Sequence, residues 1–535
     1  MNKKMKKKII LACALLLALV AAILLIVFLP SCSSDDTAAG EIDLGIDITR
    51  SVNAEGLHVA KVNTNDKGEI ENNSYGKLID KLPAEIEKIT MKTSEGNYTF
   101  LIENPVNEDG TTEASVYTLE GFEDYDLATT NPSLLTSAVC NIDFVKVADL
   151  SGEDAAEYGF DAPSAEATAY YSDSTYSVVR VGDAAPGGEH YYIQFGDNNR
   201  VYIAAATEVN AMLLSITDQF NTAINSDKTD IADDSFDEIV LGGTHLENKI
   251  VIKANKDTSV DCAYVLSSDS DKPVRVTEGS AIVGAIKALV TDKVVAVNPD
   301  EKNLKDYGLL KPYATVRTTY VQKKTTYDVE GNEIVGEPEY FEVSLLASKP
   351  DADGNVYLMQ ESGKLVYQIA ASKVPWVETS YDKLMSEYVL KPAYSALESV
   401  VLECGGKSYK FELYTETVQS ADSDGNATEV EENRVKLAGK TVDPDQFYVL
   451  FEDLTLMERA GKDTATAAKG TALKITYNYN TGRKSDTVVL SSTDSQKILE
   501  QVNNARYGYV YQSYVSALVS NIKALAQGKE IVRVS

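Results

Sequence analysis

Cysteine, histidine and tryptophan are scarce in this chain of 535 residues, which contains five, three and one of them respectively. Beyond Cys13 and Cys32, the cysteines are Cys140, Cys262 and Cys404, which lie far apart and form no C-x-x-C pair. An odd number of cysteines at such spacing does not make a disulfide framework. We therefore expect three free thiols, with a single Cys262–Cys404 bridge as the alternative.

The three histidines, His58, His190 and His245, are isolated from one another, and the sequence has no His-Glu-x-x-His spacing. A zinc site built on that motif is therefore excluded. We expect the histidines to be solvent-exposed loop residues.

Three short motifs resemble parts of functional sites, and each lacks a required element. Residues 405–408 (Gly-Gly-Lys-Ser) end like a phosphate-binding loop, but position 401, where the motif needs its first glycine, is a valine. Residues 420–431 copy part of a calcium loop, but they begin with serine and lie between strand-like segments. Residues 520–523 (Ser-Asn-Ile-Lys) lack the companion motifs of penicillin-recognising enzymes. The sequence therefore predicts no catalytic, cofactor-binding or metal-binding residues, and a protein that is not an enzyme.

Long apolar runs are absent except for one at the N-terminus. Five lysines within residues 3–8 precede an uninterrupted apolar run over residues 9–29. A helix of that length spans roughly 31 Å at about 1.5 Å per residue, which is the thickness of a bilayer core. Because lysines stay on the cytoplasmic side, we expect one transmembrane crossing, with the N-terminus in the cytoplasm and the body outside.

A lipid anchor is the alternative to a retained transmembrane helix. Residues 29–32 (Leu-Pro-Ser-Cys) resemble a lipoprotein cleavage box, in which Cys32 would be lipidated and become the mature N-terminus. The apolar run is longer than the 7–15 residues typical of a signal-peptide core, which favours the retained helix. Both alternatives leave the body outside the cytoplasm and attached to the cell membrane.

Basic residues are outnumbered, because 50 Lys and Arg face 81 Asp and Glu, for a formal net charge of −31. This balance argues against nucleic acid or an anionic membrane surface as a partner. The expected contact with the membrane is therefore through the N-terminal segment alone.

The body of the chain contains an internal repeat. Residues 158–163 (Tyr-Gly-Phe-Asp-Ala-Pro) recur as residues 307–312 (Tyr-Gly-Leu-Leu-Lys-Pro). Further on, Tyr192 and Tyr202 match Tyr357 and Tyr367 at an offset that is 16 residues larger. The extra residues lie around positions 325–340, which we interpret as an extended hairpin. Matches in one register over such a distance indicate a duplicated domain.

Each repeat has the same order of local signals. An alternating strand at residues 86–91 or 236–241 is followed by a helix, a short strand, the Tyr-Gly-x-x-x-Pro turn, hairpin strands and a closing helix near residues 207–220 or 372–388. A third, degenerate copy begins at residues 397–402. The predicted class is α+β, with antiparallel sheets and flanking helices. The predicted domains are 1–32 (anchor or signal), 33–85 (polar tether and short β element), 86–235, 236–394 and 395–535.

Tyrosine is abundant, with 31 copies, and many of them crowd the strands of the first repeat. Cross-strand packing accounts for most of them. An exposed subset on one strand face could stack on glycan or peptide, and the candidates are Tyr171, Tyr176, Tyr192 and Tyr202.

The order of helix, Tyr-Gly-[Phe/Leu]-x-x-Pro turn, alternating strands and Val-Tyr strand resembles a bacterial family, the domain-of-unknown-function family 4340. The resemblance covers about residues 86–388. It implies an exported, single-anchor protein that acts as a non-enzymatic accessory subunit beside a gliding-motility-type ABC permease and its ATPase. It implies no catalytic residues and no cofactor. The alternative is a surface lipoprotein or adhesin-like module that binds glycan or peptide through the aromatic strand face.

Overall fold

A computed structural model describes residues 76–107, 113–149, 152–196, 199–224, 235–269, 272–327, 333–421 and 427–534. The predicted anchor, Cys32 and His58 lie outside these ranges. Within them, no helix is long and apolar enough to cross a membrane. The chain divides into two compact units, one of residues 1–124 and 130–215, and the other of residues 125–129 and 216–535.

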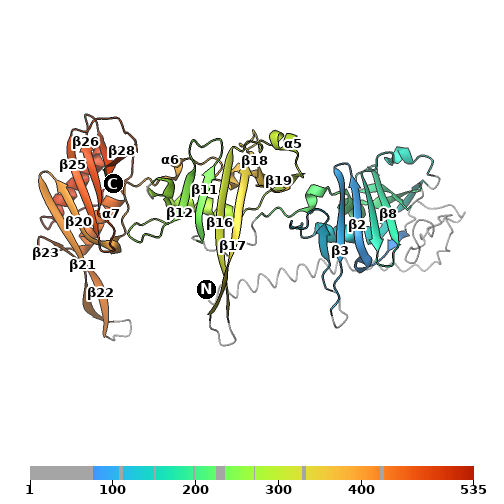
Figure 1. Ribbon diagram of the computed structural model, residues 1–535, viewed down its shortest axis with the longest axis horizontal. Coiled ribbons are helices and arrows are strands. Elements are labelled where there is room, and N and C mark those ends of the chain that lie inside the picture. Colours follow the sequence, from blue (N-terminus) through green and yellow to red (C-terminus); the bar gives the residue numbers. More distant parts are fainter. Residues whose placement is uncertain are drawn as a thin grey trace. The chain divides into compact units, whose positions relative to one another are not determined.

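The first unit contains an antiparallel sheet with the strand order β4-β3-β2-β7-β8-β9-β10-β6 (Figure 1). A helix, α2 (Asn131–Cys140), lies in sequence between the two halves of this sheet. A separate pair of strands, β1 (Gly76–Asp80) and β5 (Asn141–Phe144), joins the segment before the sheet to the segment after α2. The strands of the sheet are β2 (Ile86–Thr93), β3 (Gly96–Glu103), β4 (Val116–Leu119), β6 (Lys146–Asp149), β7 (Ala165–Tyr171), β8 (Tyr176–Ala184), β9 (His190–Phe195) and β10 (Val201–Ala205).

The second unit contains two sheets of nine strands each. The first of them has the order β14-β13-β12-β11-β16-β17-β18-β19-β15, with α4 (Val276–Lys287) at the position that α2 has in the first unit. Its strands are β11 (Phe236–Gly242), β12 (Ile250–Ala254), β13 (Tyr264–Leu266), β14 (Lys272–Pro273), β15 (Lys293–Val297), β16 (Ala314–Tyr327), β17 (Glu333–Ala347), β18 (Asn355–Gln360) and β19 (Leu365–Ala370).

The other sheet has the order β23-β22-β21-β20-β25-β26-β27-β28-β24, again with a helix, α7 (Pro444–Thr455), between its halves. A last helix, α8 (Gln512–Leu525), closes it. Its strands are β20 (Leu397–Cys404), β21 (Lys407–Ala421), β22 (Ala427–Leu437), β23 (Lys440–Val442), β24 (Gly461–Lys462), β25 (Gly470–Tyr479), β26 (Asp486–Ser492), β27 (Lys497–Val502) and β28 (Ala505–Tyr511).

The three large sheets therefore repeat one plan, which confirms the internal repeat and the predominance of antiparallel strands. In each, the first central strand of the repeat pairs with the first long strand after the helix, namely β2 with β7, β11 with β16 and β20 with β25. Alternating apolar residues place one side of each strand in the core, as in β25, where every second residue from Leu473 to Tyr479 is buried. We refer to the three repeats as domains 1, 2 and 3.

Two predictions about local structure have opposite outcomes. The extended hairpin is confirmed, because β16 and β17 pair from Ala314–Ala347 out to Tyr327–Glu333, and Figure 1 shows this ribbon running beyond the rest of its sheet. The closing helices of the first two repeats are wrong. Residues 207–220 form a short helix, α3 (Ala206–Val209), and 3-10 turns. Residues 372–388 contain the end of a 3-10 turn (Ala371–Lys373) and the short helix α6 (Tyr381–Leu384). In the second case Pro375 disfavours a continuous helix, since it lacks an N–H and restricts the residue before it.

Candidate functional site

Two of the four tyrosines predicted to line a binding face lie in the core. Tyr171 is 2% exposed and its hydroxyl is 2.7 Å from Ser177 Oγ, while Tyr202 is 1% exposed and packs on Phe144 with ring centroids 5.0 Å apart. Burial raises the pKa of both phenols to about 12. For these two residues the prediction of an exposed binding face is wrong.

The burial of Tyr171 follows from its place in the repeat. Tyr171 and Tyr479 end β7 and β25, and Tyr320 lies in the middle of β16. Each of the three pairs with the first residue of the neighbouring central strand. All three are at most 7% exposed. Comparing these three positions would have revealed a repeated core position, whereas the crowding of tyrosines in one repeat did not.

Tyr192 has a structural role in the Tyr-Gly-x-x-x-Pro turn. Its ring centroid lies 4.7 Å from that of Tyr158, and in domain 2 the equivalent pair of Tyr357 and Tyr307 is 4.9 Å apart. The motif's tyrosine thus packs on a tyrosine of β9 or β18 and holds the turn against the sheet. The glycine that follows, Gly159, has a left-handed backbone with φ +87°, which glycine adopts without a steric cost.

Tyr176 is the only one of the four that is strongly exposed, at 44%. It lies opposite Tyr170, which is 37% exposed, with ring centroids 6.2 Å apart. The Lys88 ammonium is 4.1 Å from the centroid of the Tyr170 ring. The predicted aromatic face therefore reduces to this exposed pair on one side of the sheet.

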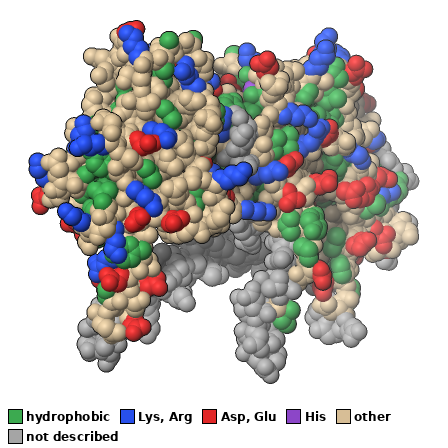
Figure 2. Space-filling model, turned by 60° about the vertical axis from the view of Figure 1, so that its left-hand side comes forward, with side chains coloured by type: hydrophobic (Ala, Val, Ile, Leu, Met, Phe, Trp, Pro, Cys, Tyr) green, Lys and Arg blue, Asp and Glu red, His purple; other side chains and the backbone are tan. Residues whose placement is uncertain are grey.

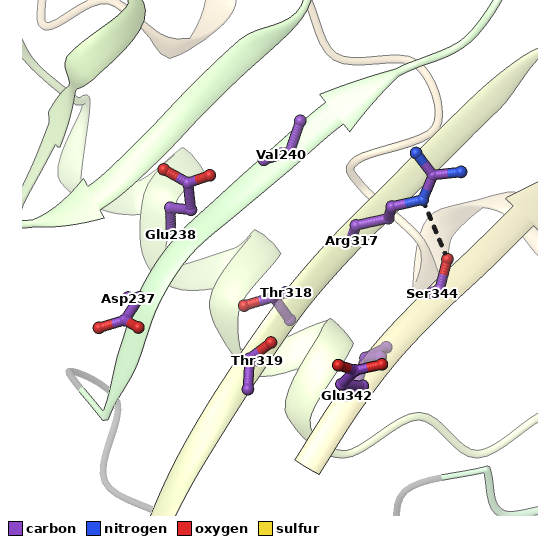
Figure 3. Close-up of a pocket in the computed structure, with 9 residues that line it drawn as sticks. Asp237, Glu238, Val240, Arg317, Thr318, Thr319, Glu342 and Ser344 are labelled. Carbon is purple, nitrogen blue, oxygen red and sulfur yellow. Dashed lines mark hydrogen bonds between the residues drawn. The ribbon is translucent and has the colours of Figure 1, made fainter. Parts of the chain in front are cut away.

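A hollow of about 600 Å³ lies on the face of the domain 2 sheet at the base of the β16–β17 ribbon (Figure 3). Val240, Arg317 and Ser344 form one row across β11, β16 and β17, because each is paired with the next. Thr319 and Glu342 form the next row. Here β11 has an irregularity between Phe236 and Ile239, and Asp237 and Glu238 line the hollow at this point.

The single arginine of the hollow is engaged. Its guanidinium forms two hydrogen bonds with Glu361, of 2.9 and 2.6 Å, and Ser344 Oγ donates to the same carboxylate at 2.6 Å. These hydrogen bonds lower the pKa of Glu361 and raise that of Arg317. Since Arg317 already holds a carboxylate, the hollow offers a ligand mainly the oxygens of Asp237, Glu238, Glu342 and Thr319. Such a surface is suited to hydrogen bonding with a polar or basic partner.

The remaining candidate residues, the cysteines and histidines, lie at positions where they support the fold. Cys140, Cys262 and Cys404 form no disulfide, which confirms the expected thiols and excludes the Cys262–Cys404 bridge. His190 is half-buried in β9. His245 is half-buried and stacks on Tyr313, with centroids 4.8 Å apart and Nδ1 2.7 Å from the Tyr313 carbonyl oxygen, so the expectation of an exposed histidine is wrong there. Across the described ranges, no three His, Cys, Asp or Glu side chains are grouped so that they could hold a metal ion.

The segments that join consecutive repeats are paired through their main chains. In the first connector, residues 219–224, the Asn221 N–H donates to Asp126 O at 2.9 Å and the Ile224 N–H donates to Leu289 O at 2.8 Å. The first half of this connector thus pairs with the segment before α2, and the second half with the segment after α4.

The second connector, residues 384–389, repeats this arrangement. The Ser386 N–H donates to Pro273 O and the Val389 N–H to Met457 O, each at 3.0 Å. Its first half pairs with the segment before α4, and its second half with the segment after α7. No local sequence signal marks either connector, because the bonding partners lie about 65 to 110 residues away.

A buried ion pair supports the second connector. Arg459 is bonded to Glu500, which is fully buried, and its Nη1 donates to Ser386 O at 2.8 Å. Burial raises the pKa of Glu500, while the neighbouring Arg459 opposes this shift. Arg275 also contacts Glu387 at 3.1 Å. The connector is therefore held by charged side chains as well as by its main chain.

A family model described as a domain of unknown function (DUF4340) matches this chain over residues 118–278 and 265–469. The two segments together cover about two-thirds of the chain. They begin in the equivalent strands β4 and β13, and each contains one connector. No curated protein matches the chain.

Proposed function

Because the chain belongs to the DUF4340 family, for which no function is assigned, we propose its role from its own architecture: a non-enzymatic, membrane-tethered accessory subunit outside the cytoplasm. Its partner would be an ABC-type permease with its ATPase, as in a gliding-motility-like transport system. The repeats would present docking surfaces to the outer side of that permease.

The N-terminal sequence supports the location in this proposal. Five lysines precede an apolar run long enough to cross a bilayer once, and the acidic body that follows suits a solvated surface. Acidic and basic side chains are interspersed on the face that Figure 2 shows, which suits contact with a protein better than contact with a polyanion.

The observation that carries the proposal is the pair of connectors. Two successive connectors each pair with two flanking segments through isolated bridges and the same main-chain hydrogen bonds, so the connector residues themselves are hydrogen-bonded structure. Successive repeats of one plan offer a series of similar surfaces along the chain, which suits a docking subunit. The β16–β17 ribbon and the hollow at its base add a surface of hydrogen-bonding groups.

A crosslinking pull-down tests this role. The tagged full-length protein is crosslinked in native membranes, purified and analysed by mass spectrometry, next to a control bait in which residues 1–41 carry an unrelated soluble domain. We expect the full chain, and not the control, to recover an ABC permease together with its ATPase. Recovery of no membrane partner by the full chain at matched depth would contradict the accessory role.

A glycan- or peptide-binding surface protein is the second candidate, and the exposed pair of Tyr170 and Tyr176 favours it. Stacking on this pair should be lost in Tyr176→Ala and kept in Tyr340→Ala, which removes a 66% exposed tyrosine elsewhere. Glycan-array and peptide-array binding of the three proteins measures this. Equal binding by both variants would count against the tyrosine pair as a site.

A further inference from the structure

We propose that the outer edge of β23, in domain 3, binds an extended strand of a partner protein in antiparallel pairing. This proposal rests on the accessory role, because it names the surface on which a partner docks. Each of the two connectors in this chain already pairs with the equivalent edge segment of domain 1 or domain 2.

In domain 2, the second connector pairs with the edge of the sheet through an isolated bridge between Val274 and Met385. Val274 donates its N–H inward to Tyr264 O at 2.9 Å, while the groups on either side face outward. Arg275 N–H donates to Leu384 O at 2.7 Å, and Pro273 O accepts from the Ser386 N–H at 3.0 Å. The first connector uses the same two bonds, from Ala128 N–H to Gln219 O and from Asn221 N–H to Asp126 O. Each connector is thus bound by two main-chain groups of the edge segment, a carbonyl oxygen and the N–H of the residue two positions later.

Domain 3 has the same edge. Val442 in domain 3 is equivalent to Val274 in domain 2, because Val442 pairs with Val435 and Val274 is hydrogen-bonded to Tyr264. In both domains a helix begins two residues later, at Pro444 or at Val276. By this register, the outward carbonyl is that of Thr441 and the outward N–H is that of Asp443. Both residues are exposed. Among residues 76–534, as far as the structure describes them, no main-chain partner pairs with these two groups.

The connectors also indicate what the occupant looks like. The central residue of each is apolar, Phe220 opposite Leu127 and Met385 opposite Val274. Phe220 is only 2% exposed, so the central side chain is covered when the strand is in place. In domain 3 the residue opposite it would be Val442. The fitting partner is therefore an extended protein segment with an apolar residue at its centre and free main-chain groups on both sides, as in other cases of β-strand addition.

The test uses the full-length protein and a synthetic peptide of residues 380–390, which contains the second connector. The matched control peptide carries Ser386→Pro and lacks the N–H that would donate to Thr441 O. We expect saturable binding by fluorescence anisotropy, at least tenfold weaker for the control peptide. Hydrogen exchange at Asp443 should slow when the first peptide is bound.

A protein variant separates edge pairing from other binding. Thr441→Pro keeps the carbonyl and reproduces the proline found at the equivalent position 273, so peptide binding should persist. Equal affinity for both peptides, or protection at a place other than residues 441–443, would overturn the proposal. So would self-association of the full chain that the peptide abolishes, because the edge would then belong to a second copy. None of these results depends on whether an ABC permease is the partner.

Discussion

Burial explains why certain positions of the repeat are tyrosine, and backbone conformation explains why others are glycine. Tyr171 and Tyr202 are buried phenols, and the folded protein keeps them protonated, because burial raises the pKa of each to about 12. Gly159 and Gly308 sit at equivalent turns with φ of +87° and +71°. For both kinds of residue, the effect of a single substitution on stability can be predicted.

Alkaline pH should destabilise domain 1 through its buried phenols. A phenol whose folded pKa lies above its unfolded value near 10 contributes stability that is complete below pH 10 and is lost as pH rises through about 12. For Tyr202 the loss is at most about 2–3 kcal/mol. We expect Tyr202→Phe to unfold with a shallower pH dependence than the wild type between pH 10 and 12, measured by urea denaturation. Tyr176→Phe, at an exposed position, is the control, and an unchanged slope in Tyr202→Phe would refute this role.

Alanine at Gly159 should cost more than alanine at Gly308. Both substitutions place a side chain in a left-handed backbone, which costs about 1–2 kcal/mol. A Cβ at Gly159 would also lie 2.6 Å from Asp183 Cγ, whereas a Cβ at Gly308 would meet Ser348 Cβ at 3.4 Å. Gly187→Ala, where φ is +104° and no atom lies within 4 Å, isolates the backbone term. Thermal unfolding should rank Gly159→Ala as the most destabilised of the three, and an equal shift for all three would show that the contact with Asp183 is unimportant.

At the scale of the element, the connectors between the repeats are the feature that no local sequence signal predicts. Each is a short segment with two isolated bridges, which pair it with the segments that flank a helix. The second connector also receives Arg459 Nη1, and Arg459 is at the same time the partner of buried Glu500. A buried charge of this kind is costly when its partner is removed.

Arg459→Ala should therefore destabilise the second unit by about 3–5 kcal/mol, because it leaves Glu500 buried without its partner. Replacing both residues, as Arg459→Met with Glu500→Leu, should cost much less. Lys469→Ala, which removes an exposed ion pair with Asp494, should cost less than about 1 kcal/mol. Urea unfolding followed by circular dichroism measures all three. A loss in Arg459→Ala as small as that in Lys469→Ala would mean that the pair does not support the connector.

The elements differ in how far the sequence predicts them. The repeat and the long hairpin could be predicted, since period-2 alternation and turn residues are local signals. The connectors could not, because Asn221 finds its acceptor at Asp126 and Ser386 finds its acceptor at Pro273, and nothing nearby in the sequence marks either contact. The sequence also did not show which face of the sheet Tyr171 lies on. Alternation separates two faces of a strand but does not say which face is buried.

At the scale of the whole chain, three sheets of one strand order follow one another, and the family model matches segments that run across the connectors. The repeating unit therefore includes the joint to the next repeat as well as the sheet. This arrangement is what makes a docking role for the chain reasonable, and it makes the state of the connectors in solution the most informative property to measure.

Hydrogen exchange of the full-length protein at the connector amides tests this most directly. The account predicts that the N–H groups of Asn221, Ile224, Ser386 and Val389 exchange at least about a hundredfold more slowly than amides in an unstructured peptide, because each donates to a main-chain carbonyl. Exchange of these four amides at the rate of an unstructured linker would contradict it, since the connector hydrogen bonds would then not persist in solution.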